Sequence, residues 1–390
     1  MAQPTTLAFA YIEEFRCLTD RCPDNCCHDD WRIAIDEKHA RLYQHTYPAL
    51  YDIIAKDDSG YHMRRDKAQC PALDQGLCAI HRDYGESLLS DTCMNYPRMY
   101  RAFDHFQTKA GTLSCPEIAR KCLTDAHPFA LVDSVLPDHH QDGQGLIQQQ
   151  TQGLDASRWQ QLQTALIGQI LDSERSLPEV LQRLALQVEA MEQQPVTEWQ
   201  TLFDSPVARQ PASNANTPGS STLPLVVLLE QLDRPGTPES MRQGVLNAFD
   251  VLPTEGQPEF RLQPRYQHYY AQFSKALDQR LQRYTAAEIT RTGFPLLSNT
   301  SAGQDYGLSL REWFHTLVIR VMSLRLLVVI NSGNSDATAL ATDEQWVEWV
   351  YQFSRKVNHQ PVGPCELALR LELNEQGLPR LATCLDFNAL

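Results

Sequence analysis

Basic residues are scarce in this sequence. Its 390 residues include 34 Lys and Arg against 48 Asp and Glu, which gives a formal net charge of −14. A surface of that sign does not neutralise phosphates along a groove. We therefore expect no nucleic-acid partner, and we expect any protein partner to offer a cationic surface.

Long uncharged apolar runs are also missing. The most apolar stretch, Trp313 to Ile330, is interrupted by His315, Arg320 and Arg325. A membrane-spanning helix needs about 20 predominantly apolar residues and rarely carries charges. This stretch predicts a buried helix, and we expect no membrane insertion.

The first residues lack the pattern of a secretory signal. Met1 to Tyr11 has no basic segment, Pro4 and two threonines break its apolar residues, and Glu13 and Glu14 follow. This favours a cytoplasmic protein. In a reducing compartment, closely spaced cysteines are more often metal ligands or redox groups than disulfides.

Familiar catalytic signatures are lacking too. Cys22 and Cys26 have the first spacing of the Cys-x3-Cys-x2-Cys motif of radical S-adenosylmethionine enzymes, but Cys27 follows at once. Gly143 and Gly145 follow a polar stretch, so they predict a turn and not a Rossmann nucleotide site. No Ser/His/Asp or paired-carboxylate signature indicates a hydrolase.

The sequence does have a concentration of cysteines. Nine of the eleven lie between Cys17 and Cys122. Thiolates select zinc, copper(I) or iron–sulfur clusters, and this excludes calcium and magnesium. We predict that this region binds a metal ion or an iron–sulfur cluster. The ligand candidates are Cys17, Cys22, Cys26, Cys27, Cys70, Cys78, Cys93 and Cys115.

The number and spacing of these ligands leave alternatives open. The neighbours Cys26 and Cys27 cannot easily chelate one tetrahedral ion together, so they are expected to differ in role. Eight thiolates exceed the four that one cluster uses, so either two centres share the region or some cysteines serve packing or chemistry. His28 or His81 could replace a thiolate, or could be an ordinary solvated side chain. Cys122 is left undecided, and Cys365 and Cys384 are expected to be ordinary thiols.

Apolar periodicity predicts a mainly α fold, in which a cysteine-rich domain organised by its metal centre precedes an irregular helical domain. Residues 1–127 form the cysteine-cluster domain, with short helical or irregular pieces between the ligands. Residues 128–204 form a helical segment, 205–224 a disordered linker or insertion, and 225–390 an α-helical C-terminal domain. Alternating apolar residues near Leu367 predict a strand or two at the end of the chain.

The helices predicted from apolar stripes run from Ser157 to Ile170, from Leu177 to Met191, from Leu225 to Leu232, from Pro264 to Tyr284, from Leu310 to Val328, and from Thr342 to Val357. The last of these opens with a capping box at Thr342 and Gln345.

Taken in order, the cysteine motifs resemble those of the flagellin lysine N-methylases. The matching motifs are Phe15-Arg16-Cys17, Cys22-Pro23-Asp24-Asn25-Cys26-Cys27, Trp31-Arg32-Ile33-Ala34-Ile35-Asp36, Cys70-Pro71, Gly76-Leu77-Cys78-Ala79-Ile80, Cys93-Met94-Asn95-Tyr96-Pro97-Arg98 and Leu113-Ser114-Cys115-Pro116-Glu117-Ile118-Ala119-Arg120. A broad family of shorter zinc- or iron-chelating cysteine-cluster proteins shares part of this pattern, over the N-terminal third alone.

A weaker resemblance to the methylases extends further along the chain. It runs through Phe294-Pro295, Leu317-Val318-Ile319-Arg320 and Phe353-Ser354-Arg355-Lys356-Val357-Asn358-His359. The sequence departs from the family at the charged segment His28-Asp29-Asp30 and at the insertion-like residues 205–224.

The resemblance implies transfer of methyl groups from S-adenosylmethionine to lysine ε-amines of flagellin. It also implies an iron–sulfur cluster, [4Fe–4S], held by the cysteines named above; zinc is the alternative. Lysine is nucleophilic only when neutral, so a methylase must desolvate the amine or accept its proton. Tyr96, Asp91 and Trp31 lie near the cysteine motifs and are the catalytic candidates; simple packing over the centre is the alternative for the two aromatic residues.

A rival hypothesis is that the chain catalyses no reaction. The chain could be a non-enzymatic zinc, iron or iron–sulfur protein, or a redox sensor, whose helical part binds a partner.

Overall fold

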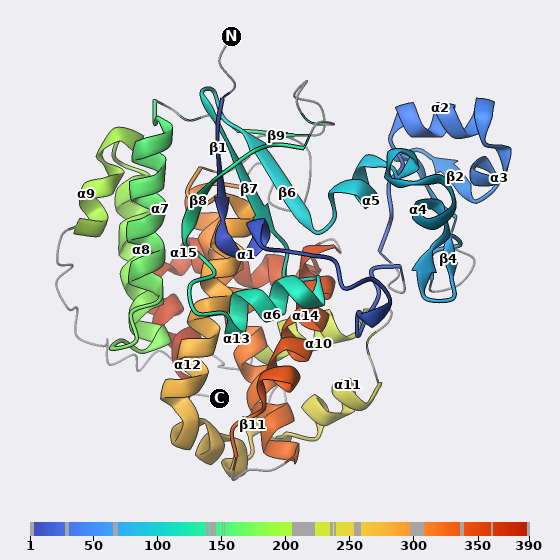
Figure 1. Ribbon diagram of the computed structural model, residues 1–390. Coiled ribbons are helices and arrows are strands. Elements are labelled where there is room, and N and C mark those ends of the chain that lie inside the picture. Colours follow the sequence, from blue (N-terminus) through green and yellow to red (C-terminus); the bar gives the residue numbers. More distant parts are fainter. Residues whose placement is uncertain are drawn as a thin grey trace.

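The computed structural model describes residues 4–27, 31–64, 69–137, 140, 146–149, 151, 153–204, 223–234, 237, 239–252, 259–296, 308–335, 339–359 and 362–387. This part of the chain is mainly α, as predicted (Figure 1). Of the predicted linker, residues 205–222 lie outside the described residues, and Leu223 and Pro224 belong to a helix. The division into domains stays a prediction.

Helices make up most of the described C-terminal two thirds. They are α7 (Ala156–Ile170), α8 (Leu177–Met191), α9 (Trp199–Asp204), α10 (Leu223–Leu232), α11 (Glu239–Leu246), α12 (Pro264–Thr292), α13 (Leu310–Ser335), α14 (Asp343–Asn358) and α15 (Pro364–Leu385). The six helices predicted from apolar stripes are all present. The capping box of α14 is confirmed, because the Thr342 side chain accepts from the Gln345 N–H and the Gln345 side chain accepts from the Thr342 N–H.

Helix α13 lies at the centre of this helical layer. Leu310–Asn334 is long and apolar enough to cross a membrane by length and composition, but its most apolar window is entirely buried inside the protein. It packs against α10, α12 and α15. The prediction of a buried helix here is confirmed.

The end of the chain corrects the sequence analysis. The alternating leucines expected to form a strand lie in α15, which has Pro364 in its first turn and a kink at Gly377. Leu369 and Leu373 are four residues apart and buried, whereas Leu367 and Leu371 are 41% and 52% exposed. The alternation therefore reflects two leucine pairs on opposite faces of one helix.

The sequence analysis also missed a five-stranded sheet. Its strands are β8 (Leu131–Ser134), β1 (Thr5–Phe9), β7 (Phe106–Gly111), β6 (Arg98–Ala102) and β9 (Ile147–Gln148), in that order across the sheet. Strand β1 pairs in parallel with β7, so that Leu7 lies opposite Thr108. Short strands that pair across some hundred residues leave little periodicity for a sequence analysis to detect. Two short helices follow strands of this sheet, α1 (Ala10–Glu13) and α6 (Pro116–Thr124).

The buried apolar residues form two separate clusters. The first, which we call the main body, joins the five-stranded sheet, α6 and the long helices. The second lies within the described part of residues 27–94, which we call the small lobe, and includes Trp31, Tyr43 and Ile80. Figure 1 shows the small lobe at one side of the molecule, apart from the long helices.

The small lobe contains only short elements. They are α2 (Glu37–Thr46), α3 (Pro48–Tyr51), β2 (Ile54–Asp57), β3 (Gly60–Met63), β4 (Leu73–Asp74), β5 (Leu77–Cys78), α4 (Ala79–Tyr84) and α5 (Asp91–Asn95). A further hairpin, β10 (Phe249–Leu252) with β11 (Glu259–Leu262), belongs to the main body. Of the predicted cysteine ligands, Cys115 belongs to the main body, and Cys27, Cys70, Cys78 and Cys93 belong to the small lobe.

Candidate metal centre

The loop that carries Cys22, Cys26 and Cys27 is tied to the small lobe by backbone contacts. The Asn25 side chain donates to the carbonyl oxygen of Gly76 at 2.8 Å and accepts from the Cys27 N–H at 2.8 Å. The Cys70 N–H donates to the Cys27 carbonyl oxygen at 2.7 Å. These bonds bring the first cysteine group to the second, some 45 residues further along the chain.

A tight hairpin positions Cys78. Strands β4 and β5 pair Leu73 with Cys78, and the two residues between the strands, Gln75 and Gly76, have φ angles of 49° and 80°. Two successive positive φ angles define the turn that best fits a two-residue hairpin. Cys78 leaves this hairpin as the N-cap residue of α4. Burial raises the pKa of its thiol, and the backbone N–H groups of Ile80 and His81 at the start of α4 oppose that rise.

Cys115 is presented in the same way by the main body. It is the N-cap residue of α6, with Pro116 in the first turn, so its sulfur lies near the first N–H groups of that helix. Pro at the first helical position requires no donor there and starts the helix at this point. Burial nevertheless raises the pKa of the Cys115 thiol to about 12. Cys78 and Cys115 therefore both lie at helix N-termini, where the first backbone N–H groups of a helix favour a thiolate.

Cys26 is the thiol around which the others gather. Burial is the main cause that raises the thiol pKa values of Cys22, Cys78, Cys93 and Cys115, and the nearby Cys26 adds to the rise at each of them. Its own pKa is lowered, first because the Cys27 thiol donates a hydrogen bond to it and then because of the positive charge of Arg355.

The adjacent cysteines have different surroundings, and their predicted difference in role stays a prediction. Cys26 is exposed, whereas Cys27 is buried. The pKa of the Cys27 thiol is raised by its hydrogen bonds with Cys26 and Cys70 and by burial. These opposite shifts keep the shared proton of the pair on Cys27.

Seven of the eight thiols form two overlapping groups that share Cys26. Cys70, Cys78 and Cys93 approach it from the small lobe, and Cys17, Cys22 and Cys115 complete the group on the side of the main body. Burial raises the pKa of Cys93 to about 12. Clustered thiols with raised pKa values remain neutral at pH 7 unless a bound cation offsets the charge of their thiolates.

The spacing of the thiols bears on the type of centre. A zinc ion with Zn–S bonds of about 2.3 Å holds tetrahedral thiolates about 3.8 Å apart. Among the cysteines, all of which lie in the described part, no three sulfurs fall within 4.8 Å of one another. The arrangement is therefore wider than one tetrahedral ion requires.

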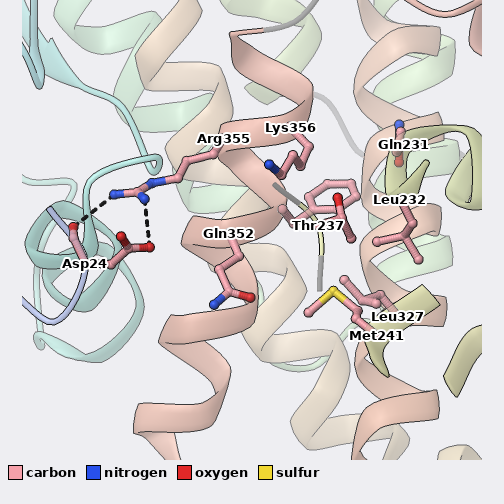
Figure 2. A pocket seen from close by; sticks show the side chains of 10 residues that line it. Asp24, Gln231, Leu232, Thr237, Met241, Leu327, Gln352, Arg355 and Lys356 are labelled. Carbon is pink, nitrogen blue, oxygen red and sulfur yellow. Dashed lines mark hydrogen bonds and ion pairs between the residues drawn. The ribbon is translucent and has the colours of Figure 1, made fainter. Parts of the chain in front are cut away.

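Helix α14, more than 200 residues later in the sequence, contributes Arg355 to the site. Arg355 is buried and forms an ion pair with Asp24, Nη1 to Oδ2 at 2.7 Å, while Nη2 donates to the Asp24 carbonyl oxygen at 3.0 Å (Figure 2). Its Nε donates to the Ser114 carbonyl oxygen at 3.0 Å. One guanidinium thus joins the loop of Cys22 and Cys26 to the residue before Cys115.

We call the contacts of the Arg355 guanidinium with Asp24 and Ser114 the Arg355 clamp. The rings of Trp31, Tyr96 and His359, which we call the aromatic group, lie beside it. The ring centroids of Trp31 and His359 are 4.5 Å apart, those of Trp31 and Tyr96 are 5.5 Å apart, and Arg355 lies over Trp31 at 5.3 Å. The hydroxyl of Ser114 lies 2.8 Å from His359 Nε2 and 3.2 Å from the Tyr96 hydroxyl. Burial raises the pKa of Tyr96 well above its usual value, so Tyr96 stays protonated.

The catalytic candidates are therefore divided. Trp31 and Tyr96 share one site, whereas Asp91 lies with Asp36 and His39, whose ligand atoms are within 4.8 Å of one another. That trio is a helix cap: Asp36 accepts from the His39 and Asp91 N–H groups and from the His39 ring. We assign it a structural role.

The remaining candidates are placed as follows. His28 lies outside the described residues, and His81 is exposed on α4. Cys122 is fully buried in α6 and belongs to the core of the main body. Cys365 and Cys384 lie on α15, outside the thiol groups described above. All eleven cysteines are free thiols.

The sequence analysis did not select Arg355 and His359 as site residues. Arg355 lies in the last turn of α14 and His359 is the C-cap residue of that helix, and they reach Asp24 and Ser114 across more than 240 residues of sequence. The available signal was a charged segment, Arg355-Lys356, placed between Phe353 and Val357 on an apolar stripe.

No protein-family model, curated protein or solved structure matches this chain.

Proposed function

We propose that this chain is a protein-lysine N-methyltransferase that uses S-adenosylmethionine, modifies flagellin and carries a cysteine-bound iron–sulfur cluster. The observation that carries the proposal is the joining of two features at one place: the cysteine groups around Cys26, and the aromatic group of Trp31, Tyr96 and His359 hydrogen-bonded to Ser114. The methyl donor and the flagellin substrate rest on the family resemblance.

The donor set fits an iron–sulfur cluster. Cysteine thiolates are the usual ligands of such clusters, and backbone N–H groups directed at sulfur tune them. Cys26, Cys70, Cys78 and Cys93 would hold a cluster at the small lobe, and Cys17, Cys22, Cys26 and Cys115 are the set that faces the main body. When bound, a cluster supplies a centre that can exchange electrons and polarise a ligand on iron.

The residues around Trp31 suit an amine substrate. Methyl transfer forms an N–C bond as the C–S bond of the sulfonium donor breaks, and the electron pair of that bond leaves with sulfur. The amine must first lose a proton. Tyr96 keeps its own proton, so it cannot act as the base, and His359 can accept the proton while its Nε2 contact with Ser114 orients the ring. Trp31 and Tyr96 desolvate the amine and lower its pKa.

A second candidate is a non-enzymatic cluster protein or redox sensor. Cavity size favours it: the cavity that borders Asp24 and Arg355 measures about 80 Å³. Sites for drug-sized ligands typically measure about 300–1,000 Å³. A complete molecule of S-adenosylmethionine would have to extend beyond this cavity.

The test uses the full-length protein, purified and reconstituted without oxygen. We expect it to transfer labelled methyl groups to purified flagellin, and we expect His359→Gln to lower the rate about 100-fold while iron content is unchanged. Cys26→Ser should lose iron, whereas the matched variant Cys365→Ser should retain it. If the iron-loaded protein neither binds S-adenosylmethionine nor methylates flagellin, the methyltransferase proposal is wrong and the non-enzymatic cluster protein or redox sensor is favoured.

A further inference from the structure

A buried cation lies beside one of the two thiol groups. Arg355 extends from α14 towards Asp24 (Figure 2), and its side chain is 3% exposed. The ring centroids of Trp31 and Tyr351 lie 5.3 Å and 5.2 Å from its guanidinium carbon. Aromatic faces attract a cation. The guanidinium therefore holds a fixed positive charge away from bulk solvent, where a charge acts on its neighbours more strongly than it does in water.

One backbone oxygen joins this charge to Cys22. The carbonyl oxygen of Asp24 accepts from the Cys22 thiol at 3.3 Å and from Arg355 Nη2 at 3.0 Å. A Cys22 thiolate that binds a metal has no proton to donate, and Arg355 still donates to that oxygen. The contact thus suits both states of Cys22, and in both it keeps the guanidinium next to the sulfur.

The same guanidinium reaches a second segment of this thiol group. Its Nε donates to the carbonyl oxygen of Ser114 at 3.0 Å, and Cys115 is the next residue. Arg355 is therefore held by the two segments that carry Cys22, Cys26 and Cys115. These are three of the four candidate ligands on the side of the main body.

The carboxylate of Asp24 cancels this positive charge only in part. It pairs with Arg355 Nη1 at 2.7 Å, but the Asp24 side chain is 25% exposed. Water and salt screen an exposed charge more effectively than a buried one. We therefore expect the buried guanidinium to dominate at the neighbouring sulfurs.

We propose that Arg355 stabilises the reduced form of the cluster held by Cys17, Cys22, Cys26 and Cys115, and thereby raises its reduction potential. This inference rests on the iron–sulfur cluster of the proposed function. A cluster with thiolate ligands is negatively charged, and reduction adds one electron from a one-electron donor without forming or breaking a bond. A nearby cation lowers the energy of the more negative form, because net charge near a cluster is one of the factors that set its potential.

The experiment is a redox titration of the full-length, reconstituted protein without oxygen. Dithionite supplies the electrons, the paramagnetic resonance signal of the reduced cluster is recorded against the solution potential, and the iron content of each variant is measured. Arg355→Met removes the cation and should disfavour the reduced form about 10- to 100-fold. At about 59 mV per tenfold change for one electron, the midpoint should fall by about 60–120 mV. Where two centres are reduced at different potentials, at least one midpoint should shift.

A variant with the opposite sign guards against unfolding as the cause. Asp24→Asn removes the negative charge and leaves Arg355, so the midpoint should rise, by about 30–60 mV for a 3- to 10-fold effect. Arg355→Lys retains the charge without the forked contacts of the guanidinium, and a change of less than about threefold should keep its midpoint within about 30 mV of the wild type. The control Arg158→Met removes an exposed cation on α7, and the midpoint should be unchanged.

The outcomes separate this inference from the function that it rests on. If Arg355→Met and Asp24→Asn retain iron and have the wild-type midpoint, Arg355 does not act on the cluster, and the cluster and methyl transfer still stand. If both midpoints move in the same direction, the cause is the broken Arg355 clamp and not the charge, which also contradicts the inference. If Arg355→Met loses its iron, the rise or its absence in Asp24→Asn decides. If the wild type has no reducible centre, the inference fails together with the iron–sulfur cluster, and methyl transfer to flagellin is still tested by its own assay.

Discussion

The main body and the small lobe are stabilised by different means. The main body buries helices as long as the 29 residues of α12 in one continuous apolar core. The longest helix of the small lobe, α2, has 10 residues, and the lobe's strands have two to four. A region this small buries too little apolar surface to be stable alone, so bound metal can supply folding free energy that its core does not. The comparison teaches that the thiols are part of the small lobe's core.

The largest expected effect comes from removing the metal. Chelation should abolish hydrogen-exchange protection in the described small-lobe residues 31–64 and leave α12 and α13 protected, because a structural metal in a small domain contributes about 10 kcal/mol or more. Exchange followed by mass spectrometry of peptides measures both regions in one sample. Equal protection of the small lobe with and without metal would show that its apolar core suffices.

A cavity created by mutation in the core of the main body should have the opposite effect to metal removal, because it should lower stability without loss of the metal. Leu324 is fully buried on α13, and Leu324→Ala should cost about 2–5 kcal/mol of unfolding free energy in urea while iron content stays the same. The control Leu371→Ala changes a half-exposed leucine and should cost less than about 1 kcal/mol. Loss of iron from Leu324→Ala would mean that the two regions unfold as one unit.

The third prediction concerns the contact between the regions. Arg355→Met leaves Asp24 without its buried partner and should cost about 2–3 kcal/mol, with faster proteolysis of the loop around Cys22. Arg32→Met removes another Arg–Asp pair, with Asp57, but both of those side chains are more than a third exposed. That control should change stability by less than about 1 kcal/mol. Similar losses from the two variants would argue against a clamp.

The smallest effect is a pH dependence confined to the small lobe. A hydrogen bond with Asp36 raises the pKa of His39. Burial alone would raise the pKa of Asp36, but hydrogen bonds from His39 and Asp91 outweigh it and lower that pKa. The pair's contribution is therefore complete between about pH 4 and pH 6.5. It is lost as pH rises through the folded pKa of His39 or falls through that of Asp36.

His39→Gln should remove the decline on the alkaline side. Urea midpoints of the metal-bound protein at pH 5.5 and pH 8.5, followed by a small-lobe probe, measure this. A variant that loses as much stability between these two pH values as the wild type would assign the decline to another group.

Much of the main body could be predicted from the sequence, because its helices carry complete apolar stripes. The break between α7 and α8 at Ser176 and the start of α14 at Thr342 are set by local capping contacts that the sequence displays. The sheet was missed because β1 is stabilised by partners about 100 residues away. The leucines of α15 were misread because a period of two and a helix with two apolar faces look alike over seven residues.

The candidate site was predictable only where its residues are close together in the sequence. The clustered cysteines are visible in the sequence, and Trp31 and Tyr96 lie next to them. Arg355 and His359 do not, because their role depends on which loop α14 meets after folding. Asp91 was selected for its nearness in sequence to Cys93, but its backbone instead completes the cap of α2.

The clamp by Arg355 also has a meaning for how the protein is made. The ribosome completes the loop of Cys22 and Cys26 early, but Arg355 is added 331 residues after Asp24. While the residues between them are made, the nascent thiols stand open, and α14 can reach this loop only after Arg355 has been added. If the thiols bind a metal centre, the order of translation favours loading it before α14 packs against the loop.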